Sequence, residues 1–187
     1  DLQDIFLDNQ LIIKSKKIII CTNALTNVLL PAPQVIPQRG QVLVSAPIAG
    51  GIPERLKGNF HGDAGYLYYR NIGNDRLLLG GARNLDFQGE QTDRWAENQA
   101  ITQHLTDYAI QVLGLKSEGL VWEQAWSGTM GFTPSGVPHL QALGTHRWLV
   151  AGMNGMGMAL GPEMGRRVAR WALAPGNVDL QKAGLLP

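Results

Sequence analysis

Apolar residues recur along this chain at two spacings, one typical of strands and one typical of helices. Short apolar runs separated by turn residues predict strands over residues 6–13 (a hairpin about 8–9), 17–21, 39–45, 65–70, 76–80, 121–127 and 147–152. The strands at 65–70 and 76–80 are expected to pair as a hairpin about residues 73–75. The run over 17–21 is continuously apolar, which favours a buried strand in a parallel sheet.

Two other segments have helical spacing. The first is expected to begin after a cap at Thr92 or Asp93 and to end at Gly114, with an apolar face made of Ile101, Leu105, Tyr108 and Val112. The second has a face made of Leu160, Met164, Val168 and Trp171. Strands outnumber helices in the middle of the chain, whereas both ends have an α/β pattern. The sequence therefore predicts an α+β fold with a mixed, largely antiparallel sheet and flanking helices, and the Pro-rich residues 29–33 predict a boundary.

The junction after the last strand has the most specific chemistry. Residues 148–152 (WLVAG) run into the glycine-rich residues 153–162 (MNGMGMALGP), which open the final helix. The first N–H groups of a helix have no partner within it and lie at the positive end of its dipole, and glycines allow a ligand to approach the backbone closely. This junction therefore suits an anion or the electron-rich edge of a cofactor. The alternative is a glycine-rich turn that only allows tight packing.

Composition and charge exclude several classes of function. The net charge is +1, with 16 Lys and Arg against 15 Asp and Glu, and their scatter gives no nucleic-acid footprint. The single cysteine, Cys21, excludes an internal disulfide and favours a reducing, cytoplasmic location. The longest aliphatic run, over residues 18–20, is too short for a membrane span. The four histidines have no metal-ligand spacing, and Ser127 and Ser135 lack a nucleophile elbow, so neither a metal site nor a hydrolase is expected.

Five segments together resemble FAD-dependent oxidoreductases of the D-amino-acid oxidase and glycine oxidase family. In order, they are residues 20–24 (ICTNA), 37–41 (PQRGQ), 78–83 (LLGGAR), 126–138 (WSGTMGFTPSGVP) and 152–162 (GMNGMGMALGP). The resemblance covers only the C-terminal half of such an enzyme, because the N-terminal Gly-rich βαβ unit that holds the ADP part of FAD is not found. It implies three parts: residues 1–34 as a returning segment of the FAD-binding α/β domain, 35–143 as the substrate-binding domain, and 144–187 as the C-terminal strand and helix of the FAD-binding domain.

The resemblance also implies a cofactor site. In the family, the loop and helix start that correspond to the junction face the pyrimidine edge of the flavin. The implied FAD-binding residues are Gly152, Asn154, Gly155, Met156, Gly157 and Met158. FAD is expected to be noncovalent, because residues 126–134 contain no cysteine. It is also expected to require the N-terminal FAD-binding segment as a partner, so that the chain alone, as a fragment, is inactive.

On the substrate side the chain departs from its relatives. Relatives clamp the substrate carboxylate with an arginine where this chain has Thr133, and glycine oxidase has a second arginine where this chain has Gly155. An amine without a carboxylate is therefore favoured. A carboxylate-bearing substrate would need another donor, such as Arg70, Arg83 or Arg39. The candidate substrate residues are Tyr66, Arg70, Arg83, Trp126 and Thr133.

Two classes of function follow from the sequence. The first is part of a flavoenzyme that oxidises a C–N bond of an amine or amino-acid-like substrate by hydride transfer to FAD. The second is a non-catalytic binding or assembly module that keeps the fold without the chemistry. A bound flavin in the complete protein would favour the first.

Overall fold

The computed structural model describes residues 2–8, 10–30 and 35–173, and the chain divides into two compact units. The first unit contains residues 1–37 and 130–187, and the second unit contains residues 38–129. Strands β4 (Ile36–Ser45) and β8 (Trp122–Phe132) contain the two points where the chain passes between the units. The expected middle domain, 35–143, extends past the second unit at its C-terminal end. Parts of the expected segments, at 31–34 and 174–187, lie outside the described residues.

The first unit contains a hairpin and a mixed three-stranded sheet. Strands β1 (Gln3–Phe6) and β2 (Ile12–Ser15) pair antiparallel as expected, although Asn9 of the expected turn lies outside the described residues. Strand β10 (Arg147–Ala151) pairs parallel with β3 (Ile18–Ile20) and antiparallel with β9 (His139–Ala142). The parallel pairing of β3 is confirmed, but its expected burial is wrong, because Ile19 is 38% exposed.

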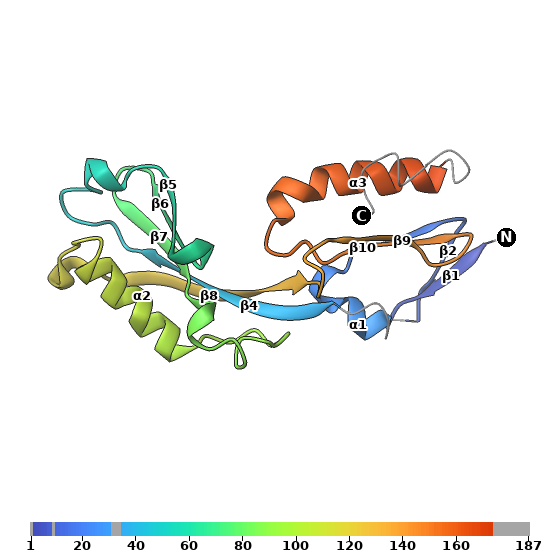
Figure 1. Ribbon diagram of the computed structural model, residues 1–187, viewed down its shortest axis with the longest axis horizontal. Coiled ribbons are helices and arrows are strands. Elements are labelled where there is room, and N and C mark those ends of the chain that lie inside the picture. The colour runs from blue at the N-terminus through green and yellow to red at the C-terminus, as the bar shows by residue number, and fades with distance from the viewer. Residues whose placement is uncertain (1, 9, 31–34, 174–187) are drawn as a thin grey trace. The chain divides into compact units, whose positions relative to one another are not determined.

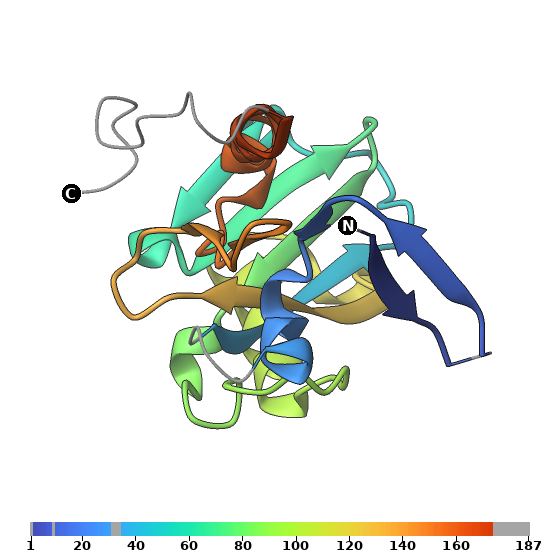
Figure 2. The ribbon, with the colours of Figure 1, turned by 90° about the vertical axis from the view of Figure 1, so that its right-hand side faces the viewer.

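Two helices belong to the first unit, the short α1 (Thr26–Leu29) and the longer α3 (Gly157–Leu173). In Figure 1, α3 lies along β10, and Figure 2 views it nearly along its axis. The predicted apolar face of α3 is confirmed. The core beneath it contains Leu140, Trp148, Val150, Met164, Val168 and Ala172, with Met153, Leu160 and Trp171 packed against them.

The second unit has a five-stranded sheet with one face covered by a helix. The strand order is β5-β6-β7-β4-β8, where β5 is Asn59–Gly62, β6 is Leu67–Ile72 and β7 is Arg76–Gly81. The predicted hairpin of β6 and β7 is confirmed. Helix α2 (Gln99–Gln111) packs on the sheet in Figure 1. The core that they share contains Leu43, Leu67, Leu77, Leu79, Ile101, Leu105 and Ala109.

Helix α2 differs from its prediction at both ends. Its cap is Asn98, whose side chain accepts a hydrogen bond from the Ala100 N–H at 3.1 Å, so the expected caps at Thr92 and Asp93 are wrong. Val112 follows the last helical residue and is 64% exposed, so it does not belong to the buried face. Gly114, with φ of 68°, ends the helical segment as expected. Short 3₁₀ turns connect other elements, at Asn23–Leu25, Glu54–Leu56, Asp63–Gly65, Arg83–Leu85 and Ser117–Gly119.

A buried ion pair joins three parts of the second unit. Arg39 on β4 donates to both carboxylate oxygens of Glu90, from Nε at 2.8 Å and from Nη2 at 2.7 Å. The side-chain amide of Asn98, at the start of α2, donates to the same carboxylate at 2.9 Å. Burial would raise the pKa of Glu90, but the hydrogen bonds from Arg39 and Asn98 outweigh burial and the pKa is lowered.

Taken over both units, the structure has the mixed α+β fold with largely antiparallel sheets that the sequence predicts.

Candidate functional site

The loop between β10 and α3 is held by two asparagines. The Asn23 side-chain oxygen accepts hydrogen bonds from the N–H groups of Gly152 at 2.9 Å and Met153 at 3.3 Å. The Asn154 N–H donates to the Gly131 carbonyl at 2.9 Å, at the end of β8. Asn154 has φ of 53°, a conformation that asparagine tolerates better than most residues. The loop is thus fixed to β8 and to the turn after β3.

The side chain of Asn154 also ties the loop to residues 133–137. It donates to the carbonyl oxygens of Gly152 at 2.7 Å and Gly136 at 3.0 Å, and it accepts from the Thr133 N–H at 2.8 Å. The Thr133 hydroxyl donates to the Val137 carbonyl at 2.9 Å, and Thr133 is only 7% exposed. These bonds use both donor groups of Thr133 to hold the loop.

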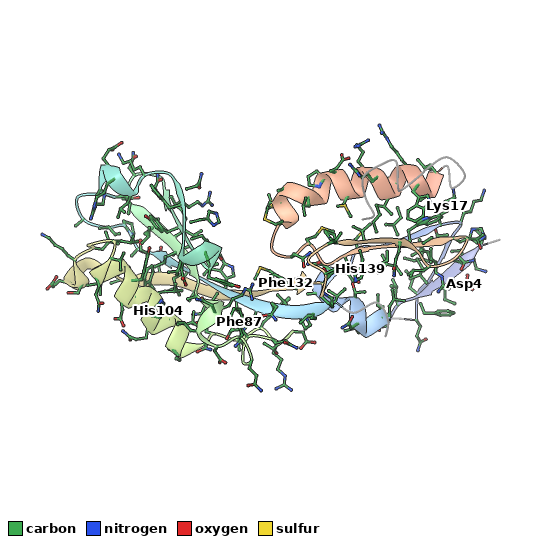
Figure 3. The ribbon with its side chains drawn as sticks, in the orientation of Figure 1. Asp4, Lys17, Phe87, His104, Phe132 and His139 are labelled. Atoms are coloured by element: carbon green, nitrogen blue, oxygen red, sulfur yellow. The ribbon has the colours of Figure 1, made fainter. Side chains whose placement is uncertain are left out.

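Glycines in this region have different roles. Gly152 has φ of 75°, and a Cβ there would lie 2.3 Å from the Thr133 Cγ2. Gly155 has φ of 81°, and a Cβ there would lie 3.7 Å from Phe132 Cζ. Phe132 and the nearby His139, whose Cδ2 would lie 3.9 Å from a Cβ on Gly152, are labelled in Figure 3. Gly157 does not have a positive φ, and a Cβ there would meet only Met153 Cβ, at 3.8 Å. The protein's own packing therefore leaves space at Gly157.

The first turn of α3 presents hydrogen-bond donors without acceptors. The N–H groups of Ala159 and Leu160 both donate to the Met156 carbonyl, at 3.1 and 2.9 Å. Within the described chain, those of Gly157 and Met158 have no acceptor, as expected at a helix start. The first turn has no acidic side chain, and Met158 is 96% exposed. Two aligned N–H groups at the positive end of the dipole fit an electron-rich group, and exposed thioether side chains fit a flat apolar ring.

A cavity of about 270 Å³ lies in the second unit. It is lined by Val42, Asn59, Phe60, His61, Tyr68, Tyr69, Arg70, Leu78 and Trp126, and we call it the sheet-face cavity. Side chains alternate between the faces of a strand. Because Leu77 and Leu79 pack in the core with α2, Leu78 between them lies on the opposite face of the sheet. Arg70, which pairs with Leu78 across β6 and β7, therefore lies on the face that α2 does not cover.

Tyr68 is positioned by a glycine on the neighbouring strand. Tyr68 pairs with Gly80 across β6 and β7, and a Cβ on Gly80 would lie 2.7 Å from the Tyr68 hydroxyl oxygen. Burial raises the pKa of Tyr68, so its hydroxyl stays protonated and can donate a hydrogen bond at neutral pH. The ring of His61 lies next to it, with ring centres 6.2 Å apart.

Of the candidate substrate residues, Arg70 and Trp126 are brought to the same cavity. Arg70 is exposed and has no hydrogen-bond acceptor or carboxylate among the described residues. Trp126 is 44% exposed. The hydrogen-bonding capacity of Arg70 is thus available to a ligand.

Tyr66 and Arg83 form a separate cluster with Phe87. The Arg83 guanidinium carbon lies 5.0 Å from the centre of the Tyr66 ring and 5.4 Å from that of Phe87. Its Nη1 donates to the Gln38 side chain at 3.3 Å. Neither Tyr66 nor Arg83 lines the sheet-face cavity. Arg39, another candidate from the sequence, forms an ion pair with Glu90.

Sequence reasoning did not select Tyr68, His61 or Asn59 for a site. A signal for Tyr68 was present, because residues 68 and 70 are two apart on a strand and therefore share a face with Arg70. His61 and Asn59 carried no such signal, since their pairing with Tyr68 and Arg70 depends on the position of β5 in the sheet.

Among the residues described, no group of three or more His, Cys, Asp or Glu side chains could hold a metal ion. The helices in the described ranges are also too short or too polar to cross a membrane.

Comparison with protein families gives one extensive match. The family of FAD-dependent oxidoreductases (DAO) matches residues 7–171. A search of curated proteins found no match.

Solved structures with a similar fold include three enzymes. Iminodiacetate oxidase from Chelativorans sp. BNC1 is 16% identical with a TM-score of 0.73, over 97% of this chain and 50% of that one. Glycine oxidase from Bacillus cereus ATCC 14579 is 15% identical with a TM-score of 0.71, over 96% and 51%. L-proline dehydrogenase from P. horikoshii is 17% identical with a TM-score of 0.65, over 96% and 50%. The chain thus spans about half the length of these structures, and at such identities the likeness concerns the fold.

Proposed function

The chain belongs to the family of FAD-dependent oxidoreductases, and from this premise we propose that it is the C-terminal part of an enzyme that oxidises a C–N bond of an amine or amino-acid-like substrate. The structures similar to it include oxidases and a dehydrogenase named for glycine, iminodiacetate and proline, all of which contain a C–N bond. FAD, when bound, supplies the acceptor for the hydride, which carries both electrons of such an oxidation.

The observation that supports this proposal best is the start of α3. The N–H groups of Gly157 and Met158 would donate to the electron-rich edge of the flavin and stabilise negative charge that develops there. Met156 and Met158 offer exposed apolar surface to a ring. Gly152, Asn154 and Gly155 hold the backbone in the required conformation through their positive φ angles and the hydrogen bonds of Asn154. In this proposal these residues bind and orient the cofactor, and the binding is noncovalent, since residues 126–134 contain no cysteine.

A further segment is proposed to complete the FAD site, since the diphosphate of a dinucleotide normally needs its own helix start. Apolar surface of the first unit supports this proposal. Phe6 on β1 is 73% exposed, and Val28 and Leu29 on α1 are 75% and 60% exposed. Strand β3 pairs on one side only in the described part of the sheet, although parallel strands are usually covered and paired. A cytoplasmic location of the complete protein stays a prediction.

The proposal is tested by purifying the product of the whole open reading frame and recording its visible absorption. We expect the spectrum of a bound flavin that is bleached by an oxidisable amine or amino acid. The 187-residue chain alone should bind FAD weakly, because it contributes only the edge contacts. Submicromolar binding of FAD to the isolated, folded, monomeric chain would contradict the need for a second segment.

One observation favours the alternative, a binding or assembly module without chemistry. The family resemblance implies a carboxylate-binding arginine at the position of Thr133, but here the N–H and hydroxyl of Thr133 form hydrogen bonds within the loop. A colourless complete protein that stays colourless after incubation with FAD would favour this alternative.

A further inference from the structure

The sheet-face cavity contains a cation without a counter-charge. None of its nine lining residues is acidic, and Arg70 has no acceptor in the described chain. Two other arginines of the second unit have partners within the protein: Arg76 contacts Glu123, and Arg55 donates to the Leu113 carbonyl at 2.6 Å. A planar guanidinium left available in a cavity is suited to a carboxylate, which it binds with two parallel hydrogen bonds.

Two residues with hydrogen-bond donors, Asn59 and Tyr68, share a sheet face with this cation. Asn59 pairs with Arg70 across β5 and β6, and His61 pairs with Tyr68 in the same register. The amide of Asn59 and the protonated hydroxyl of Tyr68 can each donate a hydrogen bond. This end of the cavity therefore offers several donors and no carboxylate that would repel an anion.

The rest of the cavity is lined mainly by apolar and aromatic residues. Leu78 on β7 and Val42 on β4 occupy the two strands between Arg70 and the strand of Trp126. Three strand spacings, each of ~4.8 Å, separate β6 from β8. Ala125 packs towards the core, and Trp126, the next residue, lines the cavity with nearly half of its surface exposed. The cavity thus has a charged end, an aliphatic floor and an aromatic end.

We infer that the sheet-face cavity binds a carboxylate-bearing substrate, with the carboxylate on Arg70 and the apolar part over Leu78 and Val42 towards Trp126. This inference rests on the proposed function, and it names the substrate as an amino acid or N-substituted amino acid. The volume of about 270 Å³ is near the lower end of small-molecule sites, at ~300–1,000 Å³, and fits a ligand of that size.

Arg70 takes this role because the other candidate donors are engaged. Arg83 lies over the rings of Tyr66 and Phe87, and Arg39 holds both oxygens of Glu90. The preference for a substrate without a carboxylate, which followed from Thr133, is thereby reversed. The carboxylate is recognised from β6 instead of from the loop after β8.

The test compares two ligands that differ in one charge, phenylacetate and phenylacetamide. Each is titrated calorimetrically into the complete protein and into the Arg70→Ala and Arg94→Ala variants. Arg94 is a matched control, an exposed arginine of the same unit that does not line the cavity. Circular dichroism checks the fold of each variant, and the visible flavin spectrum is recorded on the same samples.

We expect phenylacetate to bind at least about tenfold more tightly than phenylacetamide, since charge-assisted hydrogen bonds are the stronger class. This preference should vanish in Arg70→Ala and persist in Arg94→Ala. Trp126→Ala should weaken the binding of both ligands. Failure of both to bind, equal affinity, or a preference that survives Arg70→Ala would overturn the inference. If flavin is still bound in that case, only the inference fails; a colourless protein with the preference intact would contradict the proposed function alone.

Discussion

The ring of Tyr68 lies over the backbone of Gly80, its partner on the next strand. A Cβ on Gly80 would lie 2.7 Å from Tyr68 Cζ and 2.8 Å from Cε2, closer than side chains can pack. The absence of a side chain at residue 80 therefore sets the height of the tyrosine above the sheet and shapes one wall of the sheet-face cavity.

Gly80→Ala should force the Tyr68 ring to move. We expect a loss of about 1–3 kcal/mol in the free energy of unfolding, the usual cost of overpacking, as measured by urea denaturation. Gly128→Ala in the same sheet is the control, because a Cβ there meets no atom within 4 Å. The effect should shrink when Tyr68→Leu is combined with Gly80→Ala. Equal stability of Gly80→Ala and Gly128→Ala would contradict this packing.

The ion pair of Arg39 and Glu90 should make a large contribution to stability. Glu90→Gln leaves the Arg39 guanidinium buried without a carboxylate, so we expect a loss of about 3–5 kcal/mol at neutral pH. Chemical denaturation of the purified chain measures it. Glu123→Gln is the control, since its pair with Arg76 is half exposed and should cost below about 1 kcal/mol.

The contribution of Glu90 should depend on pH in one direction. Its pKa is lowered in the folded chain, whereas an unfolded glutamate has a pKa of about 4.3. A carboxyl group whose folded pKa is depressed adds stability above the unfolded pKa, and this stability is lost as pH falls through the folded pKa. The stability difference between wild type and Glu90→Gln should therefore be constant above about pH 5 and shrink below about pH 4. A difference that grows on acidification would refute the ion pair as its source.

The sequence predicted elements whose signals are local. The β6–β7 hairpin followed from the turn at 73–75, and the buried face of α3 followed from helical spacing. The predicted start of α2 was wrong because Thr92, Asp93 and Asn98 are all residue types that can cap a helix. Tertiary hydrogen bonds favour Asn98, whose side chain donates to Glu90 and whose N–H donates to the Gln41 side chain. Strand β9 was not predicted, because four residues with one buried position carry too little pattern.

The candidate site was predictable only where its signals are local in the sequence. The glycine-rich loop and the helix after it were visible in the sequence as one continuous segment. Two other features depend on tertiary structure. The Thr133 N–H donates to the side chain of Asn154, 21 residues away, and Arg70 and Trp126 line one cavity. No local spacing encodes such contacts.

Asn154 should be required for the shape of the loop before α3. Asn154→Ala removes its side-chain bonds to Thr133, Gly136 and Gly152 and places alanine at a positive φ, so we expect a loss of about 2–3 kcal/mol. Asn154→Gly tolerates the backbone conformation but loses the same bonds, and should cost less than Asn154→Ala. Thermal unfolding of both variants measures the difference. Wild-type stability in Asn154→Ala would show that the loop does not depend on these bonds.

Flavin occupancy in Gly157→Leu tests the central claim, that the start of α3 binds the flavin. A Cβ at Gly157 meets only Met153 Cβ at 3.8 Å, so a new side chain extends into the space proposed for the cofactor. Gly161→Leu on the same helix is the matched control, since a Cβ there meets nothing within 4 Å. The ratio of flavin to protein absorbance in the purified complete proteins should fall at least about tenfold in Gly157→Leu and stay at the wild-type value in Gly161→Leu, with both folded. Full occupancy and normal turnover in Gly157→Leu would contradict the claim.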